Sequence, residues 1–433
     1  MAPTYRAKDG LLAKVNFPLY TVQMLTGRHI LVGGGGGSSK TGVANGFEVF
    51  ELSHDGKKFI AEEVIRHETG PCVVMNCSTH SDTKHSYLVA GQESHCQLYH
   101  VRNVVLNENE NIETINGEQP NLRHRKNSKA IPKEIVANNK QMKKLTFILQ
   151  ASDSIQTDYN KEEPLQRVVR ISKNGKIMAT VVRISKNGKI MATGGADGIV
   201  RLWKFPAMEH LIDLKAHTKE IDDLDFSLHD NYLVSIAKDG QAIIWDFLRG
   251  KEVRKLLWSQ PEGSKFLYKR CRFGPIEEEK GQSALYMLTN PLGLARKQNS
   301  YLQRWFPHEG TLNKAVAIDE SLAAIAVRDD GRFVAVGTMF SGSVQLYIAF
   351  SLQKVLHISG AHSMFVTGLE FLPVSNKHTV TSVAEAAVVS ISVDNQICIH
   401  SLPYRTTVPT WIAISVIVLT LFLTFLLCAY LGI

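Results

Sequence analysis

The sequence predicts an all-β fold, a β-propeller of seven blades, followed by a single transmembrane helix at the C-terminus. Short β-rich runs that end in Gly or Asp turns recur along the chain, and the final 23 residues contain no charged side chain. The 433 residues are 44% hydrophobic and 21% charged, which provides enough apolar surface for a full core. Disorder of the whole chain is therefore excluded.

The clearest repeat unit occurs twice in succession. ADGIVRLW (Ala196 to Trp203) returns as KDGQAIIW (Lys238 to Trp245), 42 residues later. This offset matches the period of about 40 to 45 residues for one four-stranded blade of a WD40-type propeller. Weaker copies lie at residues 341–347 and 393–400. The pattern predicts seven blades, at about residues 14–66, 72–158, 168–216, 217–259, 268–317, 321–359 and 363–403.

Four residues of the fourth predicted blade match the structural tetrad of a WD40 blade: His217, Ser235, Asp239 and Trp245. In such a blade, buried hydrogen bonds link a histidine before the first strand to an aspartate in a later turn. A serine, a histidine and an aspartate also form catalytic triads, but the tetrad explains these residues more simply.

Other patterns that would indicate an enzyme or a metal centre are weak. Asp222, Asp223 and Asp225 alternate along a predicted strand, so they are not expected to act as paired carboxylates across a cleft. The six cysteines contain no C-x-x-C pair and are too sparse for a disulfide scaffold. We therefore expect reduced thiols and no covalent chemistry.

The net charge of +8 permits contact with nucleic acid, but its position argues against it. Residues 123–144 hold eight Lys and Arg and one Glu, which accounts for +7 of the total. They lie in a predicted insertion of the second blade, residues 102–144, which is expected to be disordered. No helix-turn-helix, zinc finger or basic zipper accompanies them, so no nucleic acid partner is expected.

An exact tandem duplication interrupts the third predicted blade. VVRISKNGKIMAT at residues 168–180 is repeated at residues 181–193. Only one copy is needed before the blade continues, so the spare copy should bulge out or replace a neighbouring edge strand. The sequence does not indicate which copy is the spare one.

The predicted anchor is the apolar run from Trp411 to Ile433. As a helix it would span roughly 34 Å, which matches the hydrocarbon core of a bilayer. Arg405 precedes the run and no charged residue follows it, so the positive-inside rule keeps the propeller, residues 1–405, in the cytosol. We expect residues 409–433 to span the membrane as a tail anchor with a lumenal C-terminus.

The most unusual local sequence is a glycine-rich loop, GGGGGSSKTGVANG, which begins with five glycines, Gly33 to Gly37. It is not a phosphate-binding Walker A loop, because Ser39 rather than glycine precedes Lys40 and a strand-like run follows instead of a helix. The loop is longer than a tight hairpin and should project from one face of the propeller. Glycines allow positive φ, which suits a bound cation or close approach by another protein.

The glycine loop, the blade sequence ATGGADGIVRLW, the stretch YIAFSLQ and the terminal anchor occur in this order along the chain. This combination resembles the prolactin regulatory element-binding protein family, the animal relatives of the yeast Sec-twelve protein. The resemblance implies a propeller on the cytosolic face of the endoplasmic reticulum. It also implies guanine-nucleotide exchange on the Sar-type small GTPase that starts COPII coat assembly and ER-to-Golgi transport, with COPII assembly factors at ER exit sites as further partners.

In that family the glycine-rich loop binds potassium and engages the GTPase. The resemblance therefore assigns a flexible, cation-coordinating part to Gly33, Gly34, Gly35, Gly36 and Gly37. It assigns the GTPase-engaging tip to Ser38, Ser39, Lys40, Thr41, Gly42 and Val43, with Asn45 closing the loop. Potassium is the one ion expected, and no cofactor is obligatory.

Two alternatives stay open at this point. The chain could be a membrane-tethered WD40 scaffold without exchange activity, since propellers commonly gather proteins. It could also be a DNA-binding transcription regulator, as the name of the family suggests.

Overall fold

The computed structural model of the chain describes residues 4–6, 10–38, 42–81, 85–106, 144–172, 189–228, 232–261, 265–277, 281–293, 298–374, 380, 382–404 and 410–431. These residues form 29 β-strands and one α-helix. The elements are β1 (Thr4–Arg6), β2 (Leu11–Lys14), β3 (Leu19–Met24), β4 (His29–Gly35), β5 (Asn45–His54), β6 (Phe59–Glu68), β7 (Val74–Ser81), β8 (Ser86–Gln92), β9 (His95–Leu106), β10 (Lys144–Gln156), β11 (Gln166–Ile171), β12 (Lys189–Gly195), β13 (Val200–Phe205), β14 (Glu209–Leu214), β15 (Ile221–Phe226), β16 (Tyr232–Ala237), β17 (Ala242–Asp246), β18 (Lys251–Lys255), β19 (Phe266–Pro275), β20 (Ser283–Pro291), β21 (Ser300–Phe306), β22 (Thr311–Ile318), β23 (Leu322–Val327), β24 (Phe333–Thr338), β25 (Val344–Ile348), β26 (Gln353–Ser359), β27 (Val366–Phe371), β28 (Ala386–Ser392), β29 (Gln396–Leu402) and α1 (Thr410–Leu431).

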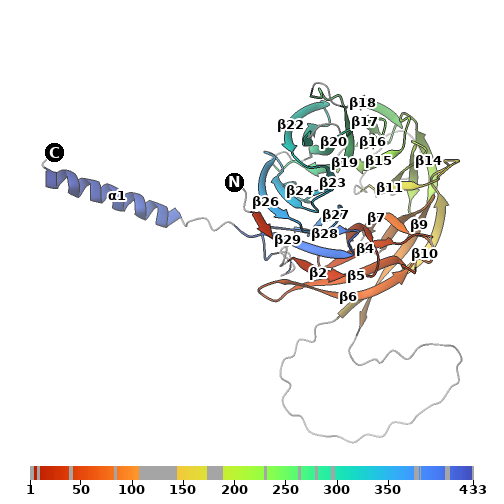
Figure 1. The fold of residues 1–433 in the computed structure, drawn as a ribbon, viewed down its shortest axis with the longest axis horizontal. Coiled ribbons are helices and arrows are strands. Elements are labelled where there is room, and N and C mark those ends of the chain that lie inside the picture. Colours follow the sequence, from red (N-terminus) through yellow and green to blue (C-terminus); the bar gives the residue numbers. More distant parts are fainter. Residues whose placement is uncertain are drawn as a thin grey trace, which may run out of the picture.

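The strands form seven sheets arranged in a ring, which confirms the predicted seven-bladed propeller (Figure 1). Each blade contains four consecutive antiparallel strands, except where the chain ends meet. The innermost strands contact one another around the ring, from β3 through β7, β11, β15, β19 and β23 to β27, and β27 contacts β3 again. The ring is therefore closed.

The core lies between adjacent blades, because each blade is covered on both faces by its neighbours. In β17, for example, Ala242, Ile243, Ile244 and Trp245 are all buried. One face packs with residues of β13 and β15 and the other with residues of β19 to β21. Strands buried on both faces are expected to be continuously apolar rather than alternating, and this is what the KDGQAIIW repeat shows.

The seventh blade is completed by the N-terminus. It has three strands of its own, β27 to β29, and β2 pairs with β29 as its fourth. Residues 363–403 are therefore not a complete blade, and Leu11–Lys14 belongs to the last blade rather than preceding the first. In addition, β1 runs parallel to β26 as a fifth strand of the sixth blade. Periodicity along the chain does not reveal this pairing, because it joins residues more than 380 positions apart.

The predicted insertion and the tandem duplication both contribute residues to the sheets. Strand β9 continues to Leu106 and β10 begins at Lys144, so the first and last residues of the predicted insertion 102–144 belong to the sheet. The remainder, residues 107–143, lies outside the described residues. In the tandem duplication, β11 uses the first copy and β12 uses the second, and the Ser172 amide donates to the Ile190 carbonyl at 2.9 Å. Neither copy is wholly spare.

Antiparallel order gives the propeller two distinct faces. The connections between first and second strands and between third and fourth strands of each blade lie on one face. The connection between second and third strands and the link to the next blade lie on the other face. The β4–β5 connection is a link between second and third strands, so we call its side the glycine-loop face. Strand β29 is a third strand and ends at Leu402 on the opposite side, which we call the chain-exit face.

Among the described residues, α1 is the one helix that is long and apolar enough to cross a membrane. Its segment Ile414–Leu431 has a mean hydropathy of 2.6, and none of that segment is buried against the propeller. Both observations fit the predicted anchor, whose outer residues 409, 432 and 433 lie outside the described part.

Candidate functional site

The glycine loop begins later than the sequence predicted. Gly33, Gly34 and Gly35 are the last residues of β4, and all three are buried. Gly33 lies opposite Thr21 of β3 and Phe47 of β5, so it is paired on both sides. The expectation that all five glycines form a flexible loop is therefore wrong for these three, because the ladder fixes their backbone.

Close packing explains why β4 ends in glycines. A Cβ atom on Gly34 would lie 1.8 Å from the Pro18 carbonyl oxygen, and one on Gly35 would lie 2.1 Å from Asn45 Oδ1. Gly35 also has a φ of +143°, a backbone conformation that L-residues with a side chain rarely adopt. These glycines allow two neighbouring segments to approach β4, and they hold the base of the loop rigid.

Asn45, which was predicted to close the loop, does so with its side chain. Its Oδ1 accepts from the Gly37 amide at 2.9 Å, and its Nδ2 donates to the carbonyls of Gly37 at 3.2 Å and Gly70 at 2.9 Å. The Asn45 carbonyl accepts from the Thr69 amide at 3.0 Å. One buried side chain thus ties both ends of the loop to the connection that leads into the second blade.

The described part of the predicted tip is divided between solvent and core. Ser38 and Gly42 are exposed, and a Cβ on Gly42 would meet nothing within 4 Å. Val43 is half-buried and packs against the hydrophobic cluster that contains Val15 and Phe17. Val43 therefore pins the returning arm of the loop. Ser39, Lys40 and Thr41 lie outside the described residues.

A small pocket of about 190 Å³ lies beside the loop, between its returning arm, the β2–β3 connection and the end of β6. Its charged wall is Arg66, which pairs with the buried Glu48 at 2.7 Å. Burial raises the pKa of the Glu48 carboxyl, although Arg66 opposes this shift. Sequence reasoning missed this ion pair, and its one signal was a glutamate placed among the apolar residues of FEVFEL.

The geometry limits where the predicted potassium ion could bind. Potassium sites use carbonyl oxygens, and the carbonyls of Gly33 and Gly34 belong to the sheet ladder. Gly36 and Gly37 lie beyond the strand, and the Gly37 carbonyl, which accepts from Asn45 Nδ2, keeps a second lone pair. Gly33 and Gly34 therefore do not fit the predicted cation site, whereas the Gly37 carbonyl does. Among the described residues, no group of three His, Cys, Asp or Glu side chains could hold a metal ion.

The predicted structural tetrad is present. His217 Nε2 lies 2.7 Å from Ser235 Oγ, His217 Nδ1 lies 3.1 Å from Asp239, and Trp245 Nε1 donates to Ser235 Oγ at 2.8 Å. The serine hydroxyl is bonded to both rings, and burial lowers the pKa of His217 although Asp239 opposes the shift. The four side chains serve the fold of the blade rather than a reaction.

A second tetrad, which sequence reasoning did not assemble, lies in the seventh blade. His362 bonds Asp394 at 3.2 Å and Ser390 at 2.8 Å, and Ser390 bonds His400 Nε2 at 2.8 Å. His400 stands where the other tetrad has tryptophan, and burial with the nearby His362 lowers its pKa to about 3. The signal was VDNQICIH, in which His400 follows Ser390 by 10 residues as Trp245 follows Ser235, but the histidine of GAHS lies 28 residues before its serine instead of 18, and the tryptophan is missing.

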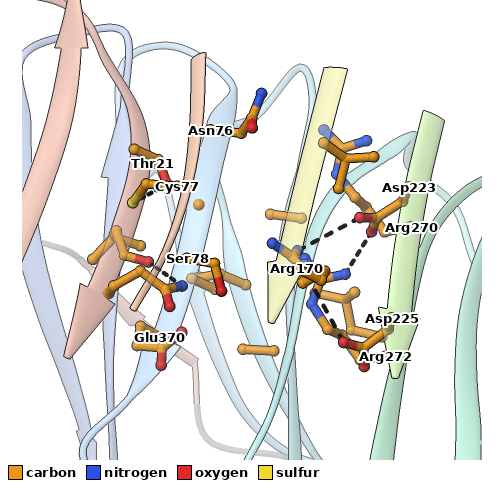
Figure 2. Close-up of a pocket in the computed structure, with 18 of the residues that line it drawn as sticks. Thr21, Asn76, Cys77, Ser78, Arg170, Asp223, Asp225, Arg270, Arg272 and Glu370 are labelled. Carbon is orange, nitrogen blue, oxygen red and sulfur yellow. Dashed lines mark hydrogen bonds and ion pairs between the residues drawn. The ribbon is translucent and has the colours of Figure 1, made fainter. Parts of the chain in front are cut away.

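The central channel contains a cavity of about 230 Å³, in which Asp223, Asp225 and three arginines gather on one side and Glu370 lies on the other (Figure 2). Asp223 pairs with Arg272 at 2.6 Å and with Arg170 at 3.5 Å, and Asp225 accepts from the Phe273 amide at 2.7 Å. Burial alone would raise the pKa of Asp223, but Arg272 and Arg170 hold it below its ordinary value. Through these contacts the two carboxylates join the third, fourth and fifth blades.

The remaining candidate nucleophiles in the described part of the chain are the cysteine thiols. All six cysteines are free. Cys77 faces the channel and lies 3.1 Å from Thr21 Oγ1, and burial raises the pKa of its thiol to about 12 (Figure 2). A thiol with such a pKa is a poor nucleophile at neutral pH.

Comparison with known proteins agrees with the fold and extends it. The WD domain, G-beta repeat family matches residues 168–204 and 208–246. The mouse protein named guanine nucleotide-exchange factor SEC12 is 30% identical over 424 residues, which cover 96% of each chain, and the rat protein of the same name gives the same values. SEC12-like protein 2 of Arabidopsis thaliana is 25% identical over 184 residues, 42% of this chain and 43% of the plant protein. A likeness of this extent, together with the propeller and the apolar helix, shows that the chain belongs to the SEC12 family.

Proposed function

We propose that this protein is a guanine-nucleotide exchange factor that acts on a Sar-type small GTPase at the endoplasmic reticulum membrane. Activation of that GTPase would initiate COPII coat assembly and ER-to-Golgi transport. The observation that carries the proposal is the identity to mouse and rat proteins named as exchange factors over 96% of the chain. The anchored propeller with a protruding glycine loop on one face supports it.

The mechanism follows from thermodynamic coupling. A protein that binds the nucleotide-free GTPase better than the nucleotide-bound form weakens nucleotide affinity by the same factor. GDP then leaves, and the more abundant cellular GTP replaces it. No nucleophile or general base of this chain is required, in keeping with the structural use of Ser235, His217 and Asp239.

The loop suits this role because it combines a fixed base with the exposed residues Ser38 and Gly42 at the two ends of its tip. Asn45 and the paired glycines of β4 hold the base, so binding to the tip orders few additional backbone residues. We assign GTPase contact to Ser38, Ser39, Lys40, Thr41, Gly42 and Val43. A potassium ion held by carbonyls of Gly36, Gly37 and the tip would supply positive charge and a defined loop conformation.

Membrane anchoring adds a second contribution. We propose that α1 spans the endoplasmic reticulum membrane with the propeller in the cytosol and the C-terminus in the lumen. GTPase activated beside the bilayer would then assemble there at high effective concentration. A glycosylation tag after Ile433 should be modified, while the same tag inserted at the exposed turn Lys57–Lys58 should stay bare; the reverse result would overturn the orientation.

The direct test is GDP release from a purified Sar-type GTPase by the full chain in proteoliposomes. Replacing residues 38–43 with a short Gly-Ser hairpin should reduce release to the uncatalysed rate, because the GTPase-engaging tip is removed. Lys57→Ser, a change in an exposed turn on the chain-exit face, should leave the rate unchanged. Unchanged release by the loop variant would favour the scaffold function instead. The same assay in potassium and in sodium buffer tests the cation.

A further inference from the structure

The chain-exit face contains a groove of about 420 Å³ that the exchange mechanism does not use. It lies between the fifth, sixth and seventh blades, on the side opposite the glycine loop. Its walls are largely aromatic and aliphatic, with Tyr286, Phe306, Phe333, Phe350 and Leu402 among them. Phe350, in the β25–β26 connection, is 69% exposed at the rim of this groove.

One arginine in the groove lacks a carboxylate partner. Arg304 of β21 is only 9% exposed, and among the described residues no carboxylate oxygen is recorded within 4 Å of its guanidinium. Its Nη1 donates to Asn313 and to the Phe350 carbonyl, both at 3.1 Å, but its Nε is buried without a hydrogen-bond partner. A buried guanidinium without a counter-charge is costly unless an anion completes it.

The other charged side chains that line the groove are one arginine and two glutamates, so the four charges including Arg304 sum to zero. Arg332 lies 3.4 Å from Glu277 and 3.8 Å from Glu385, so both carboxylates already have a cation. Arg304 also lies over the Phe306 ring, with its Cζ 5.4 Å from the ring centroid. The groove therefore offers one unpaired cation beside apolar walls, which matches a ligand with a single anionic group attached to an apolar body.

The position of the groove identifies where such a ligand would come from. Leu402 lines the groove and is the last residue of β29, and α1 begins at Thr410. From Leu402 to Thr410 the chain makes eight Cα–Cα steps, which can reach at most about 29 Å when fully extended. If α1 spans a bilayer, as proposed above, the lipid headgroups must lie within that distance of Leu402.

We propose that this groove binds the headgroup of an anionic phospholipid, with the phosphate on Arg304 and the glycerol region against Phe306 and Phe350. Binding at this site would orient the propeller on the membrane and direct the glycine loop towards the cytosol. The proposal depends on membrane insertion of α1 but not on exchange activity, so the failure of either can be recognised separately.

The test uses the full chain in nanodiscs of phosphatidylcholine alone or with phosphatidylserine added. Amide hydrogen exchange in the β25–β26 connection should slow at least about threefold in the phosphatidylserine discs, because a bound headgroup protects the groove. Arg304→Gln should abolish the difference between the two lipids. Arg249→Gln, which changes an exposed arginine on the same face of the fourth blade, should retain it.

Three results would overturn the proposal. These are equal exchange in both lipids, full protection in Arg304→Gln, or equal protection when inorganic phosphate is added to phosphatidylcholine discs, which would indicate a site for free anions. If Arg304→Gln raises amide hydrogen exchange throughout the fifth blade, the substitution has destabilised that blade, and Phe350→Ser is tested in its place. This variant keeps the bond from Arg304, because Arg304 bonds the Phe350 carbonyl and not its ring. Loss of the lipid difference in Phe350→Ser then supports the site, and its retention overturns it.

Discussion

The two faces of the propeller are built by different means. On the glycine-loop face, glycines without room for a Cβ, the Asn45 side chain and two buried tetrads fix the connections between strands. On the chain-exit face, Gly331 is confined in the same way, but connections of the fifth, sixth and seventh blades leave the Arg304 groove open, and three sequence irregularities enter: the insertion after β9, the tandem duplication after β11 and the segment that leads to α1.

This difference indicates where the protein requires defined geometry. A surface that recognises one conformation of a partner gains affinity when its backbone is ordered before binding. The chain-exit face, which we propose lies towards the bilayer, would need contact and charge rather than a fixed outline. Substitutions on the first face should therefore cost more than larger changes on the second, and four experiments examine this in order of expected effect.

The largest effect is expected for Gly34→Ala. The added methyl would collide with the Pro18 carbonyl, so β3 and β4 must separate, at a cost of about 3 kcal/mol. Urea unfolding of the full chain in detergent measures this cost. Gly37→Ala is the matched control, because its Cβ would meet nothing within 4 Å and the substitution strains only φ, by about 1 kcal/mol. Equal costs for the two variants would contradict the rigid base.

Asn45→Ala should have the next largest effect. It removes three side-chain hydrogen bonds to Gly37 and Gly70, which together should cost about 2 kcal/mol. GDP release should fall towards the uncatalysed rate, because the tip loses its fixed base. Asn45→Asp keeps the acceptor for the Gly37 amide but loses both donors, so an intermediate rate is expected. An unchanged rate of GDP release in Asn45→Ala would show that exchange does not depend on the order of the loop.

Acid should weaken the glycine-loop face through the second tetrad. Because burial lowers the pKa of His400 to about 3 from the ordinary 6.5, the unfolded chain binds this proton first and stability falls as pH drops from 6.5 towards 3. The loss should reach about 2 kcal/mol at pH 5. His400→Gln should flatten the dependence of urea midpoints on pH, and a slope equal to that of the wild type would exclude His400 as its source.

The smallest effect is expected for the largest change, deletion of one 13-residue copy of the duplication. Since β11 comes from the first copy and β12 from the second, the deletion leaves both strands and joins them through Ser-Lys-Asn-Gly. The shorter connection should raise the free energy of unfolding by at most about 1 kcal/mol. GDP release should match the parent chain and the thermal midpoint should be equal or slightly higher, whereas loss of folding would show that the intervening residues are structural.

Much of the architecture was accessible from local sequence patterns. The 42-residue repeat predicted the blades, the uncharged C-terminal run predicted α1, and His217 to Trp245 predicted the first tetrad. Each of these signals is contained within one blade or one helix. The second tetrad was not assembled, because His400 replaces the tryptophan that marks the first.

The glycine loop was found from its composition, but its limits were not. Five consecutive glycines look alike in the sequence, although three of them are sheet residues and two lie beyond the strand. Their difference arises from Pro18 and Asn45, which pack against β4 from separate segments. The Glu48–Arg66 ion pair was not predicted either, because it joins residues of two strands and is not a property of adjacent residues.

The sequence by itself determined the repeat, the apolar helix, the family resemblance and the presence of a glycine-rich connection, because each is a property of adjacent residues. The tertiary structure decided that β2 completes the seventh blade, that the two copies of the duplication share one hairpin, and that the loop and the membrane tether leave opposite faces. It also placed Arg304 in a groove beside the tether. These features depend on contacts between distant segments, which form only when the ring closes.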